Sequence, residues 1–125
     1  MSVFKDVDNF HKKYHQARNS EFNKELLELR HTLLREEYKE VKAEYDTALF
    51  KLGEIHNIEK EALTKELADL IYVTVGFAVT FGLPLEEVWH RVHESNMSKD
   101  GGTRLDGKIL KGDGYKPPQI GDLFR

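Results

Sequence analysis

Two pairs of acidic residues, each with a spacing of three positions, have the types and spacing to bind a divalent cation. The pairs are Glu37 with Glu40 and Glu66 with Asp69. Residues three apart on a helix project side by side, so each pair would present two carboxylates in one direction. Oxygen ligands without His or Cys select hard cations such as Mg²⁺ or Mn²⁺, and Mg²⁺ usually shares its coordination with substrate phosphates. The pattern therefore points towards phosphate chemistry.

These acidic residues fall on the apolar faces of the helices that would carry them. At about 100° per residue, Glu37 and Glu40 share a face with Val41, and Glu66 lies in the middle of the most apolar face of its own helix. A carboxylate moved out of water without a partner is destabilised by several kcal/mol. Each acid therefore needs a lysine from a neighbouring helix, a wet groove, or a cation. Four carboxylates that face one another are tenable only with bound cations.

Four helices are expected to position the acids. Apolar residues at spacings of three and four predict a first helix from Val3 to about Gln16, a long second helix capped by Asn19 or Ser20, a third from about Glu59 to Phe81, and a fourth with Pro84 in its first turn that ends near Met97. Residues 98–125 contain six of the nine glycines and have no helical period, which predicts an irregular Gly- and Lys-rich tail. The expected fold is an all-α, four- to five-helix bundle.

Length and composition exclude several classes of protein. A chain of 125 residues fits one domain, here 1–125. The net charge of -3 argues against nucleic-acid binding, and the absence of cysteine excludes disulfides and thiolate ligands. The N-terminus has no apolar export signal, so we expect a cytoplasmic location. The apolar run 67–85 contains Asp69 and is broken by Gly82 and Pro84, so we expect a buried helix rather than a membrane span.

Two Glu-x-x-His units offer a rival site. Glu28 with His31 and Glu87 with His90 could form a di-iron carboxylate centre in a four-helix bundle. Both pairs fall on the side of their helix away from the apolar residues. We therefore expect both pairs, and the six histidines in general, to face solvent.

Read in order, the acidic motifs resemble those of a known family. EExxE at residues 36–40 followed by ExxD at 66–69 resembles the all-α NTP pyrophosphatase superfamily, particularly MazG-like nucleoside triphosphate pyrophosphohydrolases. The segments FHKKYH, SNMSK and LKGDGYKPP also resemble segments of proteins in this family. The resemblance thus covers nearly the whole chain and implies a bundle assembled as a homodimer or homotetramer.

The resemblance also implies roles for individual residues. It implies that Mg²⁺, with Mn²⁺ as a possible substitute, is coordinated by Glu37, Glu40, Glu66 and Asp69. Glu36 would orient or deprotonate the attacking water. Four residues nearer the C-terminus would approach the nucleotide or its phosphates, namely Asn96, Lys99, Lys111 and Tyr115. From the sequence, Lys111 and Tyr115 could equally pack the tail against the bundle.

The expected reaction is Mg²⁺-dependent hydrolysis of a (d)NTP substrate to the monophosphate and pyrophosphate, as in house-cleaning of the nucleotide pool. Two alternatives stay open. One is an activity like that of phosphoribosyl-ATP pyrophosphohydrolases, which belong to the same superfamily. The other is a non-catalytic helical oligomer that binds nucleotide, with its acids paired to lysines. The sequence does not indicate which base is preferred.

Overall fold

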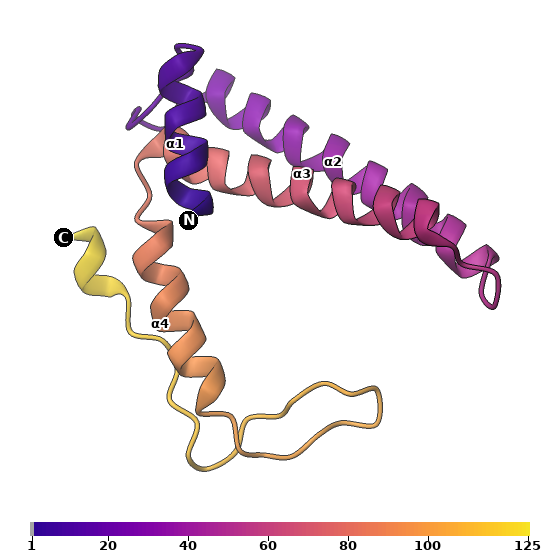
Figure 1. The fold of residues 1–125 in the computed structure, drawn as a ribbon. Helices are drawn as coiled ribbons and strands as arrows, with labels where there is room; N and C mark the ends of the chain where they lie inside the picture. The colour runs from indigo at the N-terminus through magenta and orange to yellow at the C-terminus, as the bar shows by residue number, and fades with distance from the viewer. Residues whose placement is uncertain (1) are drawn as a thin grey trace. The chain divides into compact units, whose positions relative to one another are not determined.

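The computed structural model describes residues 2–125, and its regular structure is helical (Figure 1). The elements are α1 (Val3–Lys13), α2 (Lys24–Phe50), α3 (Asn57–Phe81), α4 (Leu85–Met97) and a short 3-10 helix, η1 (Gly121–Phe124). The described chain contains no strand beyond an isolated bridge between Thr103 and Ile109. The all-α prediction is confirmed. The chain divides into two compact units, the first ending at Leu83 and the second spanning Pro84–Arg125.

In the first unit, α2 and α3 form a long antiparallel hairpin, and α1 packs against α3 (Figure 1). The buried apolar side chains are those of Val7 on α1 and of Val75, Ala78 and Phe81 on α3. The core of this unit therefore lies where α1 meets the C-terminal half of α3. None of the described helices is both long enough and apolar enough to cross a membrane.

The second helix begins later than predicted. Its N-cap is Asn23, whose side chain accepts a hydrogen bond from the Leu26 backbone N–H at 3.0 Å. The predicted caps, Asn19 and Ser20, instead donate their backbone N–H groups to Val79 O and Thr80 O at the end of α3. Asn19 also has a φ of 53°, outside the range of a helix N-cap. A tertiary contact thus moves the start of α2 towards the C-terminus.

The other boundaries lie close to their predicted positions. Gly82 ends α3 in the left-handed conformation, at φ 64°, which glycine adopts without steric cost. Pro84 is the N-cap of α4 rather than a residue of its first turn. The first helix ends at Lys13, before the predicted Gln16, because His15 has a φ of 55°.

One histidine departs from the prediction that all six face solvent. His11 is 2% exposed, and its Nδ1 donates to Ala17 O at 3.0 Å. Beside it lies the buried Arg30, whose Nη2 donates to Gln16 Oε1 at 3.3 Å. Gly76 provides the space, since a Cβ there would lie 3.2 Å from both Arg30 Nη1 and His11 Nε2. Burial lowers the pKa of His11, so the neutral ring is favoured.

In the second unit, the C-terminal segment is bonded to α4. Arg91 Nη1 donates to Gln119 O at 3.0 Å and to Asp122 Oδ1 at 2.6 Å. Arg91 Nε donates to Glu87 Oε1 at 3.1 Å. A single arginine of α4 thus binds a residue just before η1 and a residue within η1.

Candidate metal centre

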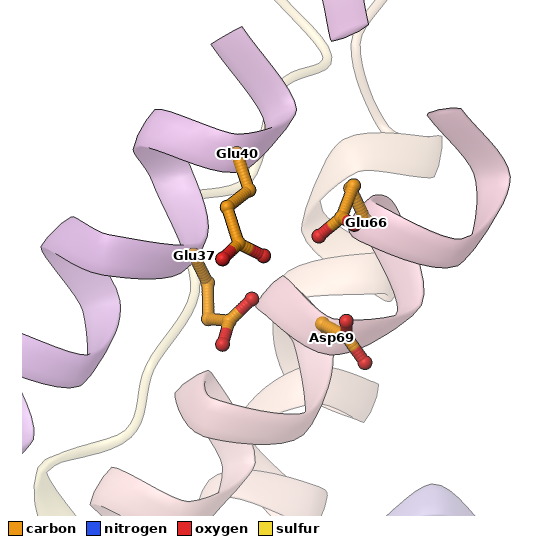
Figure 2. A group of neighbouring side chains, drawn as sticks. All are labelled: Glu37, Glu40, Glu66 and Asp69. Carbon is orange, nitrogen blue, oxygen red and sulfur yellow. The ribbon is translucent and has the colours of Figure 1, made fainter. Parts of the chain in front are cut away.

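The α2–α3 hairpin brings together the four acidic residues predicted to form a metal site. Glu37, Glu40, Glu66 and Asp69 each offer one carboxylate oxygen, and these four oxygens all lie within 4.8 Å of one another. Figure 2 shows Glu37 and Glu40 projecting from α2 towards α3, with Glu66 opposite Glu40. The i, i+3 spacing within each helix and the antiparallel arrangement of the two helices together produce the cluster.

The register of the hairpin is set at its turn. Lys51, the C-cap of α2, places its Nζ 2.8 Å from Glu59 Oε1 in the first turn of α3. The other carboxylate oxygen of Glu59 accepts the His56 backbone N–H at 3.2 Å, which completes a capping box. The Lys51 ammonium lowers the pKa of the Glu59 carboxyl. The sequence predicts Glu59 at the start of this helix but not its capping box, because His56 is not one of the usual N-cap residue types.

The cluster contains buried oxygens without hydrogen-bond donors. Glu37, Glu66 and Asp69 are half-buried and Glu40 is exposed. Within residues 2–125, Glu37 Oε2 and Glu66 Oε2 are buried atoms that have no hydrogen-bond partner. Buried acceptors are nearly always satisfied, so two in one cluster point to a missing cationic or donor group.

Lys65 compensates part of the negative charge. Its Nζ lies 2.7 Å from Asp69 Oδ2 and 3.5 Å from Glu66 Oε1. Among the described residues it is the one cationic side chain that forms ion pairs with the cluster. Lys65 belongs to the same helix as its partners, not to a neighbouring one, and its side chain is 66% exposed. One ammonium group cannot neutralise four carboxylates.

The remaining charge affects the titration of Glu66. The neighbouring Glu40 carboxyl raises the pKa of Glu66, burial raises it further, and Lys65 acts in the opposite direction. Carboxylates that share a site show this behaviour, because the second negative charge is harder to form beside the first. The ionised cluster is therefore an unfavourable arrangement that a bound cation would relieve.

The residues present fit a divalent cation of the hard class. All four candidate ligands are carboxylates, and the two oxygens without donors lie on opposite helices of the hairpin. Mg²⁺ and Mn²⁺ prefer such oxygen ligands. Glu44, one turn beyond Glu40 on α2, is half-buried but lies outside the cluster.

The other predicted site residues are not part of the acidic cluster. Glu36 is exposed on α2, next to Glu37. Asn96, Lys99, Lys111 and Tyr115 all belong to the second unit. There, Asn96 is exposed near the end of α4, and Lys111 Nζ lies 5.0 Å from the centroid of the Tyr115 ring.

The residues of the rival metal site face solvent within their own units. Glu28, His31, Glu87 and His90 are all exposed, as predicted. In the part of the chain that the structure describes, the acidic cluster between α2 and α3 is the one group of carboxylates and histidines with a spacing suited to a metal ion.

Most of the chain matches a known protein family. The model of the phosphoribosyl-ATP pyrophosphohydrolase family matches residues 7–96, a range that includes both acidic pairs. This family lies within the all-α NTP pyrophosphatase superfamily, so the resemblance is confirmed at that level, and the narrower MazG-like assignment stays a prediction. No curated protein matches the chain.

Replacing Glu66 by Gln should stabilise the metal-free protein at neutral pH, because the raised pKa means that ionised Glu66 destabilises the fold. That destabilisation is absent when pH lies below the ordinary carboxyl range and complete above the raised pKa. The difference in Tm between Glu66→Gln and the parent should therefore be positive at pH 7 and shrink towards zero on acidification. Thermal unfolding in chelator across pH measures it, with Glu44→Gln as the control. An unchanged or lowered Tm at pH 7 would show that the carboxylates do not repel one another.

Proposed function

The chain belongs to the phosphoribosyl-ATP pyrophosphohydrolase family, and we propose that it hydrolyses nucleoside triphosphates to the monophosphate and pyrophosphate. The family match supports a hydrolase that acts on a phosphoric anhydride bond of a nucleotide. The observation that carries the proposal is the cluster of four carboxylates with two buried oxygens that lack donors. A triphosphate is the kind of substrate that brings further oxygen ligands to such a centre.

In the proposed site, Mg²⁺ would be held by Glu37 and Glu40 from α2 and by Glu66 and Asp69 from α3. When bound, Mg²⁺ supplies positive charge that offsets the negative charge of the phosphates and of the departing pyrophosphate. The chain's contribution is to hold four carboxylates in place before substrate arrives. The hairpin does this through the Lys51–Glu59 ion pair at its turn and through helix packing along its length.

Glu36 is proposed to orient the attacking water and take up its proton. Its carboxylate is exposed, and it precedes the ligand Glu37 on the same helix. A carboxylate that remains in contact with water is suited to this role, since it need not give up its solvation to accept a hydrogen bond. Lys99 and Lys111 are proposed to contact the phosphates, and Asn96 and Tyr115 the nucleoside.

A second candidate substrate is phosphoribosyl-ATP, which the family match favours directly. It carries a triphosphate, and its hydrolysis by a pyrophosphohydrolase also releases pyrophosphate. The acidic cluster suits either substrate equally well, because it would contact the shared triphosphate. Discrimination between the two has to come from residues that contact the base and the sugar.

Association of chains into a homodimer or homotetramer is part of the proposal. Apolar side chains around the α2–α3 turn are strongly exposed in the single chain: Phe50 by 90%, Ile58 by 72% and Leu52 by 69%. Further along α3, Leu67 and Ile71 are also exposed. Apolar surface of this extent is typical of faces that are buried on association.

Product analysis tests the reaction. The protein is incubated with Mg²⁺ and either a (d)NTP or phosphoribosyl-ATP, and the products are separated by ion-exchange chromatography. We expect the monophosphate and one equivalent of pyrophosphate. Turnover of phosphoribosyl-ATP alone would select the second candidate. Release of orthophosphate in place of pyrophosphate, or no turnover of any of these substrates, would refute the proposed reaction.

Removing single carboxylates tests the ligand assignment. Glu40→Gln and Asp69→Asn should each lower kcat by at least about 100-fold, because losing one ligand removes several kcal/mol of charge stabilisation. Helicity measured by circular dichroism should remain unchanged. Glu44→Gln, one turn along α2 and outside the cluster, is the matched control and should retain its rate. Full activity of either ligand variant would show that the assignment is wrong.

A further inference from the structure

The segment KGDGY, residues 111–115, is held in place by the residues that directly follow α4. The Gly114 backbone N–H is shared by both oxygens of the Asp100 carboxylate, at 3.2 Å and 3.1 Å. Just beyond the segment, the Lys116 N–H donates to Ser98 Oγ at 2.8 Å. A carboxylate that accepts a backbone N–H forms one of the stronger kinds of hydrogen bond. Asp100 therefore fixes the backbone in the middle of a turn distant from it in sequence.

Two backbone hydrogen bonds lie on the other side of the contact between Asp100 and Gly114. The Gly101 N–H donates to Leu110 O at 3.0 Å, and the Leu110 N–H donates to Gly102 O at 2.9 Å. These bonds bring the chain before residue 111 alongside the chain after residue 100. Hydrogen bonds thus flank the contact between Asp100 and Gly114 on both sides: those of Gly101 and Gly102 with Leu110 on one side, and that of Lys116 with Ser98 on the other.

Two glycines permit this close packing. A Cβ on Gly112 would lie 2.8 Å from both the Asp100 carbonyl carbon and the Gly101 nitrogen. A Cβ on Gly114 would lie 2.5 Å from Asp100 Oδ2. Both distances are too short for any side chain, so the KGDGY spacing is required by the approach of Asp100.

The fixed turn carries the two tail residues proposed to contact substrate. The Tyr115 N–H donates to Gly112 O at 3.1 Å, which closes the turn between Lys111 and Tyr115. The Lys111 ammonium then lies 5.0 Å from the centroid of the Tyr115 ring, within the range of a cation–π contact. The direction of the ammonium therefore depends on the conformation that Asp100 imposes on the turn.

We infer that Asp100 is a positioning residue, which preorganises Lys111 and Tyr115 for the phosphates and nucleoside of the substrate. This inference rests on the proposed function and deepens it. Asp100 acts through the Gly114 N–H rather than by touching the substrate. Without its carboxylate, the substrate would have to order the turn on binding, which weakens binding. The acidic cluster is unchanged, so the loss should fall on KM and leave kcat nearly intact.

The test is a set of substitutions assayed with the substrate that the product analysis identifies. Asp100→Ala should raise KM by about 10-fold, in line with the loss of one charge-assisted hydrogen bond, with kcat within about twofold of the parent. Asp100→Asn keeps one acceptor oxygen and should recover most of the affinity. Gly112→Ala, which displaces Asp100 but leaves its carboxylate, should raise KM as Asp100→Ala does. Asp113→Asn, a change of the same charge at an exposed residue of the turn, is the control.

Two further measurements distinguish positioning from a general structural role. In a Lys111→Ala background, adding Asp100→Ala should raise KM by less than it does in the parent, because the contribution of Lys111 is already lost. Hydrogen exchange of the Gly114 amide should accelerate in Asp100→Ala, while the amides of α4 stay protected.

The outcomes separate this inference from the proposed function. If the parent turns over nucleotide and Asp100→Ala keeps the parental KM, or if its effect adds fully to that of Lys111→Ala, the positioning role is wrong while the reaction stands. If the parent turns over none of the nucleotides, the proposed function fails and this inference fails with it.

Discussion

Mutual repulsion among four carboxylates held between two helices is the constraint on which the rest of the structure depends. The carboxylates of Glu37 and Glu40 lie close to those of Glu66 and Asp69. Like charges on facing helices repel each other, so other contacts have to hold α2 and α3 together. The hairpin supplies these contacts with long helices packed along their length and with an ion pair between Lys51 and Glu59 at the turn. Lys65 relieves a part of the charge without removing it.

The sequence predicts most of this arrangement because its determinants are local. Helical period places both acidic pairs on apolar faces, and the spacing of three orients each pair, so the cluster follows once two helices lie antiparallel. What it did not predict depends on distant contacts. The start of α2 shifted to Asn23 because Asn19 and Ser20 bond to the end of α3. Burial of His11 depends on space left by Gly76, which no local pattern reveals.

The tail shows the same division between local and distant determinants. Glycines in residues 98–125 predicted an irregular segment, and the resemblance attached roles to Lys111 and Tyr115. The turn from Lys111 to Tyr115 is fixed by a hydrogen bond to the Asp100 carboxylate. Glycine is required at 112 and 114 because Asp100 lies too close to leave room for a side chain, which the sequence alone does not show. Glycine-rich segments are often flexible, but here Gly112 and Gly114 allow close packing against Asp100. The family match ends at residue 96 and does not reach this turn.

If the four carboxylates form a divalent-cation site, Mg²⁺ should bind to the native state of the protein. A ligand that binds only the folded protein raises Tm progressively with its concentration. We expect the Tm of the parent to rise as Mg²⁺ is titrated into chelator-treated protein, and we expect Glu37→Gln to lose most of this rise while Glu44→Gln keeps it. A Tm independent of Mg²⁺, or an equal rise in Glu37→Gln, would contradict a divalent-cation site there.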